Sequence, residues 1–165
     1  MPEEDIQNRV TTKAEGVFSW NEFYTFFYDV LTSLQYFVSE VKYTKADKKG
    51  YNIMKVRWNA SRNVDEYSRL MIRVNIFCQV SDIETEVDGK KQSLNKGEIE
   101  LTMESSIVTD YYARWETSPV LKMLKKFYES YLYKPTYDKW SMKLEKDLQQ
   151  AFEEVKAYFH MQKVR

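Results

Sequence analysis

Apolar residues recur every three or four positions between Trp20 and Val41, which is the spacing of one broad face of a helix. Ser19 stands where an N-cap residue is expected, and Glu22 three positions later completes a capping box. The pattern therefore predicts a helix from about Trp20 to about Glu40. Its apolar face comprises Trp20, Phe23, Phe26, Phe27, Val30, Leu31, Leu34, Phe37, Val38 and Val41.

The many aromatic rings on this face suit a protein core, a membrane surface or a ligand pocket. The opposite face carries the acids Glu22, Asp29 and Glu40 and neither lysine nor arginine. A helix that lies in a membrane surface has the opposite charge on its polar face, where it meets anionic lipid. We therefore expect the aromatic face to form one wall of the core, with a ligand cavity between the rings as the alternative.

After Val41 apolar and polar residues alternate with a period of two, which is typical of half-buried strands. Strands are predicted at residues 41–45, 51–60, about 69–87 and about 91–108. Asp88–Gly89 is a strong signal for a tight hairpin between the last two. The alternation slips by one residue near Ser81–Asp82, which predicts a β-bulge or a bend. The short turns indicate an antiparallel meander of about four strands.

Two helices are predicted in the C-terminal part of the chain. Ser118 as N-cap and Pro119 at the first helical position begin the first helix, and Lys134–Pro135 ends it. Thr136 then caps a longer helix over about residues 137–160. The apolar side of this helix suits packing on a sheet or, as the alternative, the seam of a dimer, and includes Trp140, Leu144 and Leu148.

The order of helix, four strands and two helices predicts an α+β fold. In this fold an antiparallel sheet of about four strands carries the N-terminal helix and the two C-terminal helices on one face. Residues 1–17 are expected to be a polar N-terminal tail, residues 18–161 a single domain, and residues 162–165 a C-terminal tail. A chain of 165 residues can bury a core without disulfides or metals.

Composition argues against several classes of function. Lys plus Arg and Asp plus Glu number 25 each, so no basic field is expected to gather nucleic acid. The single cysteine excludes an internal disulfide. The acidic, polar start of the chain does not resemble a signal peptide, and no apolar run is long enough for a transmembrane segment. We therefore expect a cytoplasmic protein.

The sequence offers little catalytic chemistry. His160 is the only histidine and Cys78 the only cysteine, and the motifs of phosphate-binding loops, nucleotide-binding folds and metalloproteases do not occur. We therefore predict no catalytic residue, no metal site, no cofactor and no enzymatic activity. Acid–base catalysis by paired carboxylates, for instance Asp110 with Glu116, is the alternative.

Charged residues gather on the predicted outer face of the sheet. Arginines of the second and third strands would lie beside glutamates of the fourth strand as cross-strand neighbours. Two large apolar residues share this face, and exposed apolar groups on a sheet suggest that another molecule covers them. The candidate partner-binding face comprises Arg57, Arg69, Met71, Arg73 and Phe77.

The segment between the last predicted strand and the next helix is rich in aromatic residues. It also holds an arginine that can stack on a ring or pair with an acid. We interpret this segment as a structural corner between sheet and helix, and the alternative is the mouth of a ligand cleft. The residues of the candidate cleft mouth are Asp110, Tyr111, Tyr112, Arg114 and Trp115.

Three blocks of the sequence, KGEIEL (residues 96–101), DYYARWE (110–116) and FYESYL (127–132), resemble segments of small uncharacterised archaeal α+β proteins. The resemblance covers the chain from Lys42 onward and implies no known activity. The predicted layout, with a long C-terminal helix held by a sheet, is also similar to that of helix-grip lipid-binding domains. That family has more strands and an extra pair of helices, so its ligand cavity is not carried over.

These observations together predict a non-catalytic interaction or scaffold module that binds a protein partner or a second copy of itself. The alternative is a carrier for an apolar ligand or lipid, held in a cleft between the aromatic helix and the sheet. Nucleic acid is not expected as a partner.

Overall fold

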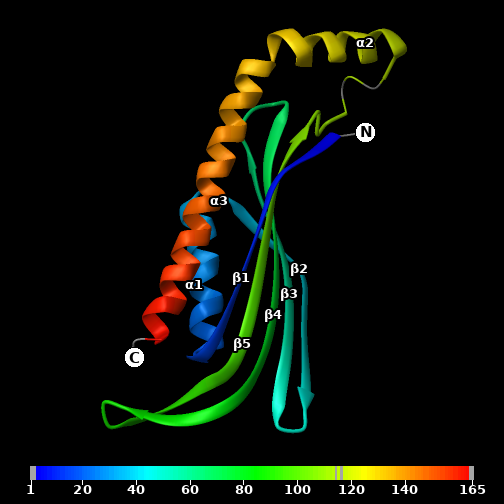
Figure 1. Cartoon of the computed structure of the whole chain (residues 1–165). Helices are drawn as coiled ribbons and strands as arrows, with labels where there is room; N and C mark the ends of the chain where they lie inside the picture. The colour runs from blue at the N-terminus through cyan, green and yellow to red at the C-terminus, as the bar shows by residue number, and fades with distance from the viewer. Residues whose placement is uncertain (1–2, 114, 116, 164–165) are drawn as a thin grey trace.

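The computed structural model describes residues 3–113, 115 and 117–163, which form an α+β fold as predicted. The described strands form one antiparallel sheet of five, in the order β1-β5-β4-β3-β2, and helices α1 and α3 lie on one face of it (Figure 1). The elements in chain order are β1 (Glu3–Phe18), α1 (Trp20–Ser33), β2 (Phe37–Lys48), β3 (Tyr51–Asn63), β4 (Ser68–Val87), β5 (Lys90–Thr109), α2 (Pro119–Phe127), a π-helical turn (Tyr128–Leu132) and α3 (Lys134–Lys163).

The prediction of a polar tail before residue 18 is wrong, because this segment forms the edge strand β1. Val10 and Ala14 face the core from β1 and pair with Met103 and Ile99 of β5. The other side of β1 faces solvent and carries polar residues such as Lys13. An edge strand with one solvated face needs few apolar residues, so its composition is close to that of a tail.

The start of α1 follows the prediction. Ser19 is the N-cap, and its Oγ accepts a hydrogen bond from the backbone N–H of Glu22 at 3.3 Å. The helix ends at Ser33, well before Glu40, because Gln35 adopts a left-handed backbone conformation with a φ of 71°.

Two backbone hydrogen bonds close this end of α1. The N–H of Gln35 donates to the carbonyl of Thr32 at 2.9 Å, and the N–H of Tyr36 donates to the carbonyl of Leu31 at 3.2 Å. This pair of bonds is a Schellman motif, in which the left-handed position is usually glycine. The chain turns at this point, so Phe37 and the residues after it belong to β2 instead of the helix.

The aromatic face of α1 forms a wall of the core, as predicted. Phe23 and Phe27 are fully buried, and their rings stack with 6.0 Å between centroids. Phe27 also stacks on Trp58 of β3 at 5.6 Å, and Phe23 stacks on Phe159 of α3 at 4.9 Å. The apolar stripe of α3, including the buried Leu148, packs into this core and does not form a dimer seam.

Beyond β3, strands β4 and β5 continue as a two-stranded arm that bends away from the sheet (Figure 1). Their pairing is continuous up to the Asp88–Gly89 hairpin, so the slip near Ser81–Asp82 reflects a bend and not a bulge. Gly97 lies opposite Val80 at this bend, and a Cβ placed on it would lie 2.1 Å from the carbonyl oxygen of Gln79. Only glycine fits where the two backbones approach this closely.

Ser118 caps α2 as predicted, and its Oγ accepts a hydrogen bond from the backbone N–H three residues later at 3.1 Å. α3 starts at Lys134 and is not capped by Thr136. Its second residue is Pro135, which a first helical turn accepts because no backbone N–H is needed there. Of the two C-terminal helices, α3 packs along the sheet, whereas α2 projects from one end of it (Figure 1), which corrects the expectation that both cover one face. The buried residue of α2 is Lys125, so no apolar residue of this helix is fully buried.

Candidate interaction surface

The outer face of the sheet lies opposite α1 and α3, and no described helix covers it (Figure 1). Side chains alternate along each strand, so the neighbours of buried residues point to this face. The five residues of the predicted partner-binding face alternate in this way with core residues of β3 and β4. The structure therefore brings together Arg57, Arg69, Met71, Arg73 and Phe77 on one uncovered surface.

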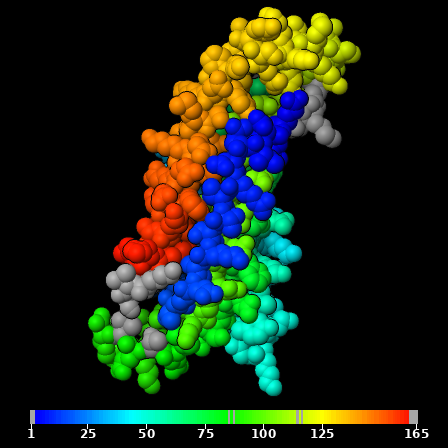
Figure 2. Space-filling view, viewed as in Figure 1, coloured from blue at the N-terminus to red at the C-terminus, as the bar shows by residue number. Residues whose placement is uncertain are grey.

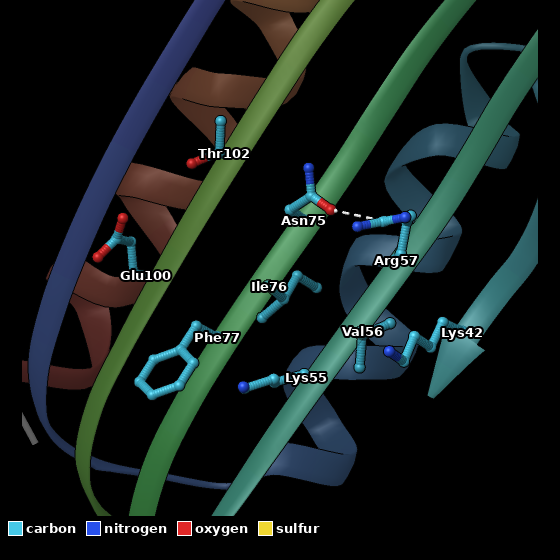
Figure 3. A pocket seen from close by; sticks show the side chains of 9 residues that line it. All are labelled: Lys42, Lys55, Val56, Arg57, Asn75, Ile76, Phe77, Glu100 and Thr102. Carbon is cyan, nitrogen blue, oxygen red and sulfur yellow. Dashed lines mark hydrogen bonds between the residues drawn. The ribbon is translucent and has the colours of Figure 1, made fainter. Parts of the chain in front are cut away.

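A shallow depression of about 240 Å³ lies on this face across strands β2 to β5 (Figure 3). Lys42, Lys55 and Arg57 lie on one side of it, and Phe77 and Glu100 lie on the other. The depression is open to solvent, so it suits a side chain of a docked protein better than an enclosed small molecule.

The cations beside this depression form no ion pair with any described residue. The Nε of Arg57 donates a hydrogen bond to the side-chain oxygen of Asn75 at 3.2 Å. The Nζ of Lys55 lies 5.9 Å from the centroid of the Phe77 ring, which is a weak cation–π contact. Lys42 pairs directly with Arg57 in the register of β2 and β3, so two like charges face each other there.

The acids of the outer face lie on β1 and β5. Arg73 donates from Nη2 to Glu4 at 2.9 Å, and its Nη1 lies 3.7 Å from Glu104, which confirms an Arg–Glu neighbour across strands β4 and β5. The hydrogen bonds from Arg73 lower the pKa of the Glu4 carboxyl below its ordinary value. Glu15 and Glu98 pair directly in the register of β1 and β5, and neither forms an ion pair within the described residues.

The outer face therefore has two pairs of opposed like charges, one at each side of the sheet. Lys42 and Arg57 form the cationic pair, and Glu15 and Glu98 form the acidic pair. Like charges directly opposite each other on a sheet are destabilising. A group of opposite charge placed over either pair would therefore stabilise it. Lys42 and Glu15 were not among the predicted site residues, because a bulge between Glu40 and Lys42 shifts the alternation and β1 was not recognised as a strand.

The predicted cleft mouth is a packed corner of the molecule. Asp110 is 3% exposed, and its Oδ2 lies 3.5 Å from the Nζ of Lys125. The Oη of Tyr111 donates to the backbone carbonyl of Asp65 at 2.6 Å, and the Tyr111 ring lies 4.5 Å from that of Tyr112. These contacts join the end of β5 to the turn between β3 and β4 and to α2.

Trp115 stacks on Tyr128 with 5.5 Å between centroids, and Arg114 lies outside the described residues. The guanidinium of Arg69 lies 4.9 Å from the centroid of the Tyr111 ring, so the corner adjoins the outer face of the sheet. The described residues of the corner thus contact one another and the body. A ligand cleft at this place stays a prediction.

Buried titratable groups near the corner act as hydrogen-bond donors. Burial raises the pKa of Tyr133 and of Tyr67 far above the ordinary value, so both phenols stay protonated even in mild alkali. Tyr133 donates to the carboxylate of Asp65 at 2.9 Å. Burial likewise raises the pKa of the Cys78 thiol to about 12, so this side chain is a protonated part of the core.

Among residues 3–113, 115 and 117–163, no three His, Cys, Asp or Glu side chains gather closely enough to hold a metal ion. Within the same ranges, no helix is both long and apolar enough to cross a membrane.

Comparison with known proteins gives this chain no family. No protein-family model matches it, and no curated protein is significantly similar to it. Among solved structures, an uncharacterised protein from Rhizobium leguminosarum aligns with 88% of this chain and 99% of its own, at 6% sequence identity and a TM-score of 0.19. A likeness at that TM-score supports no conclusion about fold or function.

Proposed function

We propose that this protein is a non-catalytic, cytoplasmic interaction module that binds protein through the outer face of its sheet. The observation that carries the proposal is the pairing of Lys42 with Arg57 and of Glu15 with Glu98 on one uncovered face. Each like-charge pair costs stability in the isolated chain, on the order of 0.2–1 kcal/mol. A docked surface with the opposite charge removes this cost.

The charges of the face favour a second copy of the chain as the occupant. In a dimer with twofold symmetry each contact occurs twice, so a surface must complement itself. Two outer faces related in this way bring the cationic pair of one copy over the acidic pair of the other. Phe77, which lies on β4 between the two pairs, is then covered at the centre of the interface.

The face is large enough for such an interface. Strands about 4.8 Å apart, with about 12 residues of about 3.3 Å each, give the five-stranded part of the described chain an outer face of roughly 1,000 Å². A standard protein interface takes about 800 Å² from each partner. The whole sheet face is therefore needed, and the arm formed by β4 and β5 can stay outside it.

Light scattering at low salt tests the proposal. The wild-type chain is expected to be a dimer that dissociates as salt rises, because screening weakens the paired charges. The variants Lys42→Glu/Arg57→Glu and Glu15→Lys/Glu98→Lys are each expected to be monomeric, since both replace attraction by repulsion. Mixed in equal amounts, the two variants are expected to form a mixed dimer, because their reversed charges complement each other.

A matched control is Lys139→Glu/Lys146→Glu, which reverses two exposed cations on α3 and leaves the sheet face unchanged. This variant is expected to dimerise like the wild type. A wild-type protein that stays monomeric at high concentration and low salt contradicts self-pairing. A dimer that neither variant weakens contradicts the use of this face.

A further inference from the structure

The apolar side chains of α2 and the turn after it face solvent. Met123 is 69% exposed, Phe127 56% and Tyr131 71%. Val120, Leu124 and Leu132 are exposed in the same way, and the rings of Phe127 and Tyr131 lie 5.0 Å apart. In the space-filling view α2 forms one end of the molecule (Figure 2). A continuous apolar stripe on a protruding helix is unusual for a soluble surface and marks a contact site.

The stripe is held in a fixed orientation by the opposite side of α2. Lys125 is 5% exposed, and its Nζ lies 3.5 Å from both Asp110 Oδ2 at the end of β5 and Glu3 Oε1 at the start of β1. Just after α2, Tyr128 stacks on Tyr133 at 5.6 Å. These contacts fasten α2 to the end of the sheet with its apolar stripe turned outward.

The polar part of α2 is basic. Lys122 and Lys126 are exposed, and α2 itself contains no acid. The first acid after it, Glu129, accepts a hydrogen bond from the hydroxyl of Tyr67 and so is turned to the body. Helix α1 has the opposite arrangement, with acids on its polar face and its rings buried. Acids on its polar face argue against a membrane role for α1, whereas lysines on its polar face favour such a role for α2.

We propose that α2 is an interfacial membrane-binding helix that lies in the surface of a bilayer containing anionic lipid. Its apolar stripe enters the boundary between headgroups and acyl chains, while Lys122 and Lys126 pair with lipid phosphates. Its position at one end of the molecule suits a flat surface, because α2 can meet it before the sheet does (Figure 1). This inference is independent of the proposed pairing of sheet faces.

Co-sedimentation with vesicles tests the inference, with the full chain and two lipid compositions. The protein is expected to bind vesicles of phosphatidylcholine with one third phosphatidylserine, less so as salt rises, and to bind phosphatidylcholine vesicles far more weakly. The variant Leu124→Ser/Phe127→Ser is expected to lose at least about tenfold in partitioning, because two large apolar groups no longer leave water. Lys122→Glu/Lys126→Glu is expected to abolish the preference for anionic vesicles.

Two control variants separate the site from general effects of charge and hydrophobicity. Met142→Ser removes a side chain that is 74% exposed on α3, and Lys146→Glu reverses a charge on the same helix. Both are expected to bind vesicles like the wild type. Tyr131→Ser, at a fully surface position, repeats the test if the double variant folds poorly.

Three results would overturn the inference. The first is no binding to either kind of vesicle. The second is binding that the α2 variants leave unchanged, which would place the contact elsewhere. The third is light scattering that shows an oligomer lost in Leu124→Ser/Phe127→Ser without any vesicle binding, which would assign the stripe to a second copy of the chain.

Discussion

The Asp65 side chain joins the turn between β3 and β4 to the start of α3. Its Oδ1 accepts backbone N–H groups of Tyr67 and Ser68, and its Oδ2 accepts Tyr133 Oη at 2.9 Å and Trp140 Nε1 at 3.2 Å. The first two bonds shape the turn between β3 and β4, and the last two bind the start of α3 to that turn. One carboxylate thus fixes the angle at which the long helix leaves the end of the sheet.

Replacing Asp65 by alanine is expected to lower the free energy of unfolding by about 3 kcal/mol, because four hydrogen bonds to its carboxylate are lost and those from Tyr133 and Trp140 are partly buried. Urea denaturation measures this change. Asp29→Ala, at an exposed position in α1, is the control and should change stability by less than about 0.5 kcal/mol. Equal effects of the two substitutions would show that Asp65 has no special role.

Single residues of the candidate face were predictable where the strand period was intact. Arg57, Arg73 and Phe77 lie in regular strands, so alternation alone placed them on the outer side. Of the two acids that pair with Arg73, Glu104 was predictable as a cross-strand neighbour, whereas Glu4 was not, because it belongs to the unrecognised β1. Alternation gives the face of a residue but not its neighbour on another strand, which depends on sheet order and register.

Among the elements, α1 shows what local signals can and cannot determine. Its start was predictable because the N-cap signal is a side chain, Ser19, with a known preference. Its end was not, because Gln35 occupies a left-handed position that glycine usually fills. The apolar pattern runs on past this point into β2, since a strand beside the core also carries apolar residues.

Gln35→Gly is expected to raise the free energy of unfolding by about 0.5–1 kcal/mol, because glycine has no Cβ to clash in the left-handed conformation. Thermal or urea denaturation measures the gain. Gln150→Gly within α3 is the matched control and is expected to destabilise by about 1 kcal/mol. A loss at position 35 similar to that at position 150 would argue against the left-handed end of α1.

β1 was missed because only one of its sides contacts the core. Val10, Thr12 and Ala14 alternate toward that side, but small and polar residues among them weaken the pattern. Sequence periodicity detects burial, and an edge strand buries too little to be distinguished from a polar segment. A fifth strand therefore becomes visible only through its pairing with β5.

Val10→Asp tests the role of β1 and is expected to cost about 2–3 kcal/mol, because a charge would replace an apolar group packed beside Met103. Thr11→Asp, one residue along and on the exposed side, is expected to cost less than about 0.5 kcal/mol. Chemical denaturation compares the two. If residues 3–18 were an unpaired tail, both substitutions would have the same small effect on stability. Equal stabilities of the two variants would therefore contradict the pairing of β1 with the sheet.

For the molecule as a whole, buried tyrosines link stability to high pH. Burial raises the pKa of Tyr24 to about 12 and the pKa of several other phenols further, from an ordinary value of 10.0. The unfolded chain therefore loses phenol protons at lower pH than the folded chain. The contribution of these protonated phenols to the free energy of unfolding is complete below about pH 10 and falls as the pH rises above 10. The phenols with the largest increases in pKa are those of Tyr24, Tyr36, Tyr67, Tyr133 and Tyr137.

The free energy of unfolding is accordingly expected to fall above pH 10, by up to about 1.4 kcal/mol per pH unit for each such group. Urea titrations at a series of pH values measure the slope. Tyr36 donates to the buried Asp147 at 2.9 Å, so Tyr36→Phe should be less stable than the wild type at neutral pH but lose stability more slowly in alkali. A slope identical to that of the wild type would contradict the assignment.

The pairing of β1 with β5 has a consequence for how the chain acquires its structure. Residues as far apart as Val10 and Met103 are direct neighbours, so this ladder is a contact of high sequence separation. During synthesis on a ribosome, β1 stays unpaired until β5 has emerged. Pairing of β1 with β5 is expected to be slower than formation of the local hairpins, because the two strands are far apart in sequence. Until it occurs, the backbone edge of β5 is exposed and can pair with other chains. Nascent chains are thus expected to be prone to aggregation until β1 pairs with β5.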